Sequence, residues 1–171
     1  MFLTRAPRCR SGPAGFTLVE LMVVVAIIAV SATLAAPGLS QMVANYRVRG
    51  AGEAILNGLN YARAEALRRN SAVRFALVAG GGGWTVSQVA PGTTLQSYTT
   101  SDPGTAVTSG TAATAVTFLP NGLVQSGTQM GQVNVTNIVD GSKSRRINVF
   151  GGGLIRMCDP GISTSNDPRR C

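Results

Sequence analysis

The sequence predicts an α+β fold in which one long amino-terminal helix precedes a domain of antiparallel strands. Three observations support this prediction. Residues from Leu21 to Leu39 carry no formal charge, residues 40–70 keep apolar side chains at helical spacing, and apolar residues after Asn70 alternate as they do in strands. The change of period near residue 70 therefore separates a helical part from a strand-rich part.

The first helical segment has the length and polarity of a membrane span. It holds about 19 uncharged residues, from Leu21 to Leu39, and a helix needs roughly 20 to cross the bilayer core. The preceding leader carries three arginines, Arg5, Arg8 and Arg10. Basic flanks stay cytoplasmic, so the chain after the span should face the periplasm or the outer surface. We therefore expect residues 16–39 to anchor the chain in a lipid bilayer.

One carboxylate, that of Glu20, lies at the start of this apolar segment. A carboxylate inside a bilayer costs about 2.5–3.5 kcal/mol on insertion scales and so needs a partner. The stretch from Gly15 to Glu20 reads Gly-Phe-Thr-Leu-Val-Glu, which resembles the processing motif of type IV pilins and pseudopilins. In that class a prepilin peptidase cleaves after the glycine, here Gly15, and the new amino terminus, here Phe16, is N-methylated.

The resemblance implies a role for the glutamate as well. Glu20 would neutralise the terminal amine of a neighbouring subunit, because an amine and a carboxylate form a charge-assisted pair when subunits dock in register. The implied partners are other pilins in the filament, the prepilin peptidase and an inner-membrane assembly platform. Residues 1–15 would be a leader that is removed.

Two other interpretations fit this segment less well. A secretory signal would be cleaved near Ser31 to Ala36, but its apolar region usually runs about 7–15 residues and lacks a glutamate near its start. A plain single-pass anchor needs neither Gly15 nor Glu20.

Residues 40–70 are expected to continue the same helix as its amphipathic half. Apolar side chains recur there at spacings of three and four: Val48, Ala51, Ile55, Leu59, Ala62 and Ala66. This stripe predicts packing on a sheet. Pro37 removes one helical hydrogen bond and should kink or loosen the helix. The resemblance implies that a helix able to stretch near this proline helps subunits fit into a filament.

Residues 71–171 are expected to form a β-rich periplasmic domain. Strands are predicted at residues 72–78, 84–89, 116–119, 133–138, 145–150 and 154–158, with turns at 80–83, 120–122, 140–141 and 151–153. Residues 90–115 are rich in threonine, serine and glycine, which predicts a long surface loop around short edge strands.

Two cysteines, Cys158 and Cys171, remain once the leader and its Cys9 are removed. An even pair in an exported chain favours a disulfide. The bridge would close a loop of about 14 residues, worth roughly 3 kcal/mol in the chain-entropy model, and would hold the carboxy-terminal tail. Two free thiols are the alternative.

The pattern along nearly the whole chain resembles the GspH/FimT family of type IV pilin-like proteins. The matching stretches are residues 61–66 at the helix end, Phe118-Leu119-Pro120-Asn121-Gly122, Arg146-Ile147-Asn148-Val149 and Ile155-Arg156-Met157-Cys158. The resemblance implies the type IV pilin fold, with the long helix packed on an antiparallel β-sheet domain. It implies a minor pseudopilin of type II secretion or a minor pilin of type IV pili, and the sequence leaves both open.

Basic residues near the carboxy terminus raise an alternative function, the binding of double-stranded DNA for uptake. DNA-binding relatives carry Gly-Arg-x-Arg in the last hairpin, whereas this chain has Gly153-Leu154-Ile155-Arg156 and keeps only the second arginine. The candidate phosphate ligands are Arg145, Arg146, Arg156, Arg169 and Arg170. The competing interpretation is a solvated edge strand, whose charges discourage sheet aggregation.

The composition argues against an enzyme. The chain has no histidine, which is the commonest general base and a frequent metal ligand. Its acidic residues are few and scattered, and no serine nucleophile motif surrounds the single lysine, Lys143. We therefore expect no catalytic site, metal or cofactor. The net charge of +8, about +5 without the leader, permits an acidic partner without requiring one.

Overall fold

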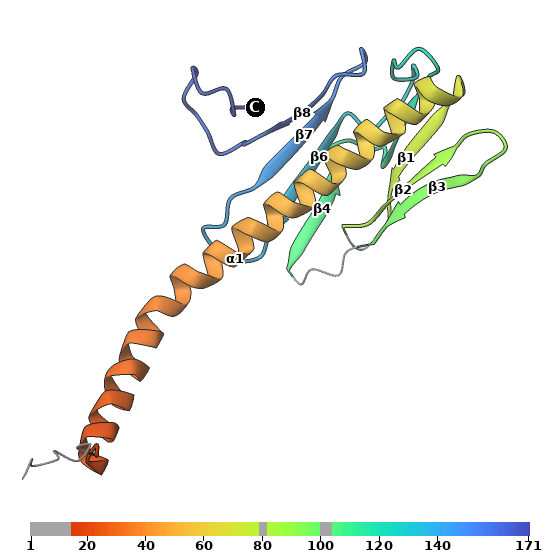
Figure 1. Cartoon of the computed structure of the whole chain (residues 1–171). Helices are drawn as coiled ribbons and strands as arrows, with labels where there is room; N and C mark the ends of the chain where they lie inside the picture. The colour runs from red at the N-terminus through yellow and green to blue at the C-terminus, as the bar shows by residue number, and fades with distance from the viewer. Residues whose placement is uncertain (1–14, 79–81, 100–103) are drawn as a thin grey trace, which may run out of the picture. The chain divides into compact units, whose positions relative to one another are not determined.

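The computed structural model describes residues 15–78, 82–99 and 104–171 and is drawn in Figure 1. The predicted leader, residues 1–15, lies outside this part except for Gly15. The chain divides into two compact units, Met1–Pro37 and Gly38–Cys171, and each is described by itself.

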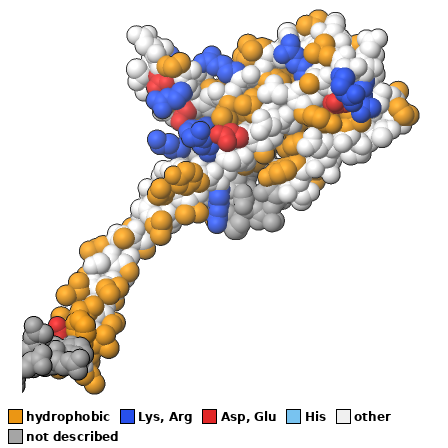
Figure 2. Space-filling view, viewed as in Figure 1, with side chains coloured by type: hydrophobic (Ala, Val, Ile, Leu, Met, Phe, Trp, Pro, Cys, Tyr) orange, Lys and Arg blue, Asp and Glu red, His pale blue; other side chains and the backbone are white. Residues whose placement is uncertain are grey.

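The described part of the first unit is the start of helix α1, which spans Leu18–Arg69 and so agrees with the predicted helix to within a few residues. Thr17 caps this helix, because its Oγ1 accepts a hydrogen bond from the backbone N–H of Glu20 at 3.2 Å. The side chains that follow are apolar and exposed (Figure 2). Pro37 lies inside α1.

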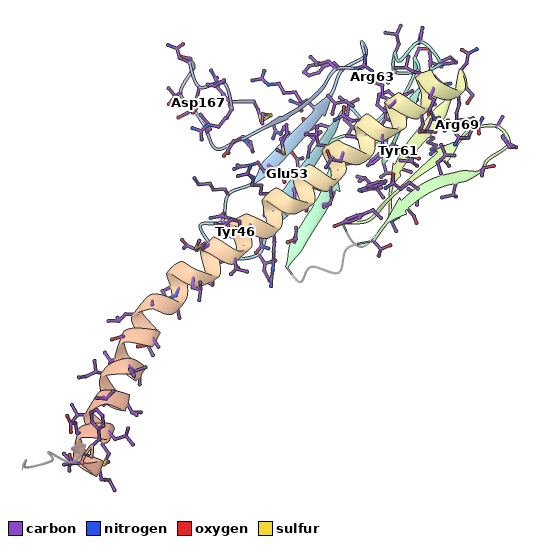
Figure 3. All side chains as sticks on the ribbon, viewed as in Figure 1. Tyr46, Glu53, Tyr61, Arg63, Arg69 and Asp167 are labelled. Atoms are coloured by element: carbon purple, nitrogen blue, oxygen red, sulfur yellow. A yellow bond between two sulfur atoms is a disulfide. The ribbon has the colours of Figure 1, made fainter. Side chains whose placement is uncertain are left out.

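The carboxy-terminal end of α1 is a Schellman motif built on Asn70. Asn70 has a φ of 48°, and its N–H donates to the carbonyl of Leu67 while that of Ser71 donates to the carbonyl of Ala66 at 3.3 Å. Near this end Glu65 is buried and pairs with two arginines of the same helix, Arg68 and Arg69. Arg69 is labelled in Figure 3.

The second unit contains two four-stranded antiparallel sheets. The first has the order β3 (Thr94–Tyr98), β2 (Trp84–Gln88), β1 (Val73–Leu77) and β5 (Ala115–Phe118). The second has the order β4 (Thr105–Ser109), β6 (Gln132–Asn137), β7 (Arg145–Val149) and β8 (Ile155–Cys158). Strands β3 and β4 fall within residues 90–115, and each is an edge strand, as predicted. The sequence did not separate the strands into two sheets.

The second half of α1 lies across both sheets (Figure 1). Its buried stripe contains all six predicted positions, of which Ile55, Leu59, Ala62 and Ala66 have no exposed surface. This stripe packs with the inward side chains of both sheets, Val73, Phe75, Val86, Val116, Phe118, Val133, Val135 and Ile147. One helix therefore closes a single core over two sheets.

Candidate assembly segment and basic carboxy-terminal site

The amino-terminal half of α1 exposes an unusually large apolar surface. An 18-residue window of this helix has a mean hydropathy of 2.5 and no part of it is buried. Its length and composition are sufficient to cross a membrane. A soluble surface rarely exposes so large an apolar patch unless the patch is an interaction site. This segment therefore needs a bilayer or neighbouring apolar helices.

Three of the predicted site residues lie at the start of this segment. Gly15 and Phe16 precede α1, Glu20 lies in its first turn, and all three are exposed. A carboxylate in the first turn also interacts favourably with the positive end of the helix dipole. The predicted cleavage position and the acidic side chain are thus both accessible to another molecule.

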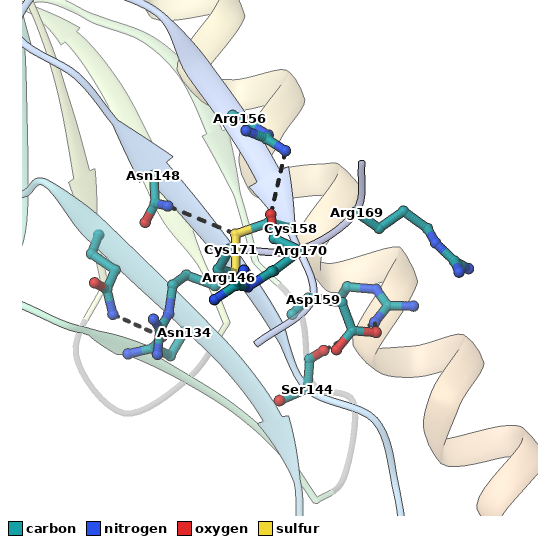
Figure 4. Close-up of a disulfide and its surroundings, with 12 residues drawn as sticks. Asn134, Ser144, Arg146, Asn148, Arg156, Cys158, Asp159, Arg169, Arg170 and Cys171 are labelled. Carbon is teal, nitrogen blue, oxygen red and sulfur yellow. Dashed lines mark hydrogen bonds and ion pairs between the residues drawn. A yellow bond between two sulfur atoms is a disulfide. The ribbon is translucent and has the colours of Figure 1, made fainter. Parts of the chain in front are cut away.

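At the other end of the chain, a disulfide joins Cys158 and Cys171, whose Cα atoms are 5.1 Å apart. It closes residues 158–171 into a loop, here called the carboxy-terminal ring (Figure 4). Inside the ring, the backbone N–H of Asp159 donates to the carbonyl of Arg169 at 2.7 Å. The structure therefore contains the predicted pairing, and the tail is held beside β8.

Two of the candidate DNA ligands hold this ring in place. Arg145 on β7 forms an ion pair with Asp159. Arg156 on β8 donates from Nη2 to the carbonyl oxygens of Pro168, at 2.6 Å, and Arg170, at 3.3 Å. Each of these guanidinium groups therefore already donates hydrogen bonds within the protein.

The remaining candidates differ in their surroundings. Arg146 donates from Nε to Oδ1 of Asn134 on β6 at 3.0 Å. Arg169 pairs with Asp167 at 2.8 Å, and these hydrogen bonds lower the pKa of the Asp167 carboxyl to about 2. Arg170 is exposed. The ring places the backbone carbonyl of Arg170 at 3.3 Å from Nη2 of Arg156.

Sequence reasoning missed the carboxylates that neutralise part of this site. The structure pairs Asp159 with Arg145 and Asp167 with Arg169. It also missed a cleft near Arg49 and Lys143, because these residues are far apart in the chain and only the packing of the domain on α1 brings them together. Among the described residues, no group of histidine, cysteine, aspartate or glutamate side chains could hold a metal ion.

A long helix with an exposed apolar first half, packed by its second half on antiparallel sheets, defines a type IV pilin-like protein. Comparison of the sequence with models of protein families supports this class. The model of the family described as Type II transport protein GspH matches residues 51–153, and that of the prokaryotic N-terminal methylation motif matches residues 10–36. The chain belongs to the GspH family.

Solved structures show the same fold. The type IV minor pilin FimU of Pseudomonas aeruginosa is similar with a TM-score of 0.55 and 19% identity, over 70% of this chain and 96% of that chain. The minor pseudopilin EpsH from the type 2 secretion system of Vibrio cholerae is similar with a TM-score of 0.52 and 14% identity, over 67% of this chain and 98% of that chain. No protein with a curated description matches the chain.

Proposed function

We propose that this chain is a minor pilin or pseudopilin that residues 16–39 anchor in the bacterial inner membrane before it joins a filament. The filament is a type II secretion pseudopilus or a type IV pilus. The proposal rests mainly on one observation, the fully exposed apolar half of α1 with a single carboxylate, Glu20, in its first turn. The domain of residues 71–171, on the amphipathic half of the helix at residues 40–70, then faces the periplasm.

Assembly follows from the chemistry of the amino terminus. A prepilin peptidase cleaves after Gly15, and Phe16 becomes the N-methylated first residue. An assembly platform moves the subunit out of the bilayer, where its apolar helix packs on the helices of other pilins. The terminal amine and the carboxylate of Glu20 are each costly alone in an apolar medium, so each finds a partner on a neighbouring subunit. Pro37 removes one helical hydrogen bond, so the helix can bend or stretch there as it packs in the filament.

The test is the substitution Glu20→Ala in cells that make the filament. The variant should insert into the membrane normally and be strongly depleted from sheared filaments, whereas Val19→Ala, a neighbouring change, should be incorporated like the wild type. Immunoblots of the membrane and filament fractions measure both. Normal incorporation of Glu20→Ala would refute the assembly role.

DNA binding is the second candidate function, and the observation in its favour is the ring, which carries Arg169 and Arg170 and is hydrogen-bonded to Arg156. A titration of double-stranded DNA at several salt concentrations tests it. Non-specific contacts of this kind give dissociation constants of roughly 10⁻⁴–10⁻⁶ M that weaken steeply with salt. An Arg146/Arg156/Arg170 triple substitution to glutamine should abolish them. Absence of binding at low salt would contradict DNA binding. The arginines would then serve only to hold the ring or as ordinary surface charges.

A further inference from the structure

A basic cleft lies between the part of α1 that belongs to the second unit and the segment that leads into β7. It consists of three adjoining depressions of about 250, 390 and 390 Å³, and Arg145 lines all of them. The helix contributes Met42, Tyr46 and Arg49, and the facing segment contributes Lys143. Tyr46 is labelled on α1 in Figure 3.

The described lining of the cleft carries more positive than negative side chains. The only carboxylate among its described lining residues is that of Asp159, which Arg145 already engages. Arg49 uses its Nε on Glu53 at 2.8 Å. The ammonium of Lys143 has no hydrogen bond or ion pair within the described residues, while its backbone N–H is fixed on Oδ1 of Asn45 at 2.7 Å. An anionic group would therefore find here an exposed, unpaired ammonium whose backbone is held beside α1.

The place of the cleft along the helix indicates which anion reaches it. Its lining begins at Gly38, beside Leu39, the last residue of the predicted membrane span. At 1.5 Å per residue, Asn45 lies about 9 Å beyond Leu39, and the headgroup layer of one leaflet is roughly 5–8 Å thick. The side chain of Lys143, beside Asn45, has the length to reach that layer.

Two exposed side chains in the same stretch fit a membrane interface. Met42 and Tyr46 are 52% and 63% exposed and line the cleft. Tyrosine is enriched at headgroup level, where its ring meets the apolar boundary and its hydroxyl stays wet. Basic side chains close to a span are attracted to anionic lipids.

We propose that this cleft binds the phosphate headgroup of an anionic phospholipid in the periplasmic leaflet and holds the domain against the membrane before assembly. This inference rests on the proposed membrane anchor. Two DNA-binding candidates, Arg145 and Arg169, also line the cleft. Arg49 and Lys143 are not among those candidates, so substitutions at these two positions test the lipid site by itself.

Native mass spectrometry of the full chain in nanodiscs tests the proposal. The nanodiscs contain equal amounts of phosphatidylcholine and phosphatidylglycerol, and the measurement is the ratio of the two lipids that the released protein retains. The wild type should retain phosphatidylglycerol in excess. Lys143→Gln and Arg49→Gln should each lower that excess by roughly fivefold, the effect of one basic residue near an anionic surface.

The controls distinguish binding in this cleft from a general attraction between basic residues and an anionic membrane. Lys143→Arg should keep the excess, and so should Arg74→Gln, which removes an exposed arginine from β1 outside the cleft. Circular dichroism and the intact disulfide mass verify that each variant is folded. Equal loss in Arg74→Gln and Lys143→Gln would overturn the proposal.

The remaining outcomes are equally decisive. Insertion with no preference for phosphatidylglycerol would overturn the lipid site and leave the anchor standing. Failure to insert into any nanodisc would overturn both. Retention of added inorganic phosphate without phosphatidylglycerol would overturn the lipid assignment.

Discussion

At the scale of single residues, Gly58 is the place where α1 lies closest to the first sheet. A Cβ at this position would lie 2.7 Å from Cε2 of Trp84 and 2.9 Å from Cε2 of Phe75. Both rings are buried, and their centroids are 5.6 Å apart, so they have little room to move. Alanine is the better helix former by about 1 kcal/mol, but this gain is smaller than the cost of overpacking.

We therefore predict that Gly58→Ala lowers the free energy of unfolding by about 1–3 kcal/mol. Gly50→Ala is the matched control on the same helix, because no atom lies within 4 Å of the added Cβ. It should be neutral or stabilising by up to about 1 kcal/mol. Thermal unfolding of both variants measures the difference, and equal melting temperatures would contradict the packing argument.

Glu65 makes the stability of this helix end depend on pH. Hydrogen bonds from Arg68 and Arg69 lower the pKa of its carboxyl from 4.5 to about 2. Since the folded pKa lies below the unfolded value, the stabilisation is fully present above pH 4.5 and is lost as the pH falls towards about 2.

Glu65→Gln should therefore be less stable than the wild type at neutral pH, by about 1–2 kcal/mol. This figure allows for solvent, which weakens the two ion pairs because the arginines are partly exposed. The difference should shrink below pH 4.5 and be almost absent near pH 2. Melting temperatures of the two proteins across this range measure it. A difference that stays constant with pH would mean that packing, rather than charge, is what Glu65 contributes.

At the scale of elements, the carboxy-terminal ring depends on its disulfide. Apart from Cys158–Cys171, the ring is joined to the sheet by the ion pair of Arg145 with Asp159 and the hydrogen bonds of Arg156. The hydrogen bonds of Arg156 are exposed and contribute little each, and the pair of Arg145 with Asp159 is partly buried. Closing a 14-residue loop is worth roughly 3 kcal/mol.

Cys171→Ser should therefore release the ring while the two sheets stay folded. In hydrogen exchange, the amide of Asp159, which donates to Arg169, should lose its protection, and amides of β6 and β7 should keep theirs. Arg156→Gln, which keeps the disulfide, should leave the ring attached. Unchanged protection of Asp159 in Cys171→Ser would assign the attachment to the arginines instead.

The elements also differ in how far the sequence could predict them. The stripe from Val48 to Ala66 and the central strands have strong periodicity, so their faces were predictable. Strand β4 consists of threonine, serine and small apolar residues, and β3 is mostly exposed. Only their pairing with β6 and β2 distinguishes them from loop. The pairing of Arg145 with Asp159 follows from the register of β7 and β8, in which Arg146 lies opposite Cys158. The contacts of Arg156 with Pro168 and Arg170 depend instead on how the tail returns to the sheet, which no local pattern encodes.

At the scale of the whole molecule, the proposed assembly depends on removal of the proposed leader. This leader holds three arginines, Arg5, Arg8 and Arg10, and Phe16 could supply a free amine to a neighbouring Glu20 only after cleavage. An uncleaved chain has an amide at Phe16, which carries no charge. In the proposed function, processing would therefore convert a chain with an unpaired carboxylate into one that carries both halves of an ion pair.

A bulky residue in place of Gly15 should block that conversion. Gly15 is exposed and no atom lies within 4 Å of where its Cβ would be, so Gly15→Trp should not disturb folding, and any effect reports on the peptidase. The variant should remain in the membrane at the full length of 171 residues and be depleted from filaments as strongly as Glu20→Ala. The intact mass of the membrane-extracted protein measures cleavage. A mature mass for Gly15→Trp equal to that of the wild type would place the cleavage site elsewhere, and the pairing of the Phe16 amine with Glu20 would lose its basis.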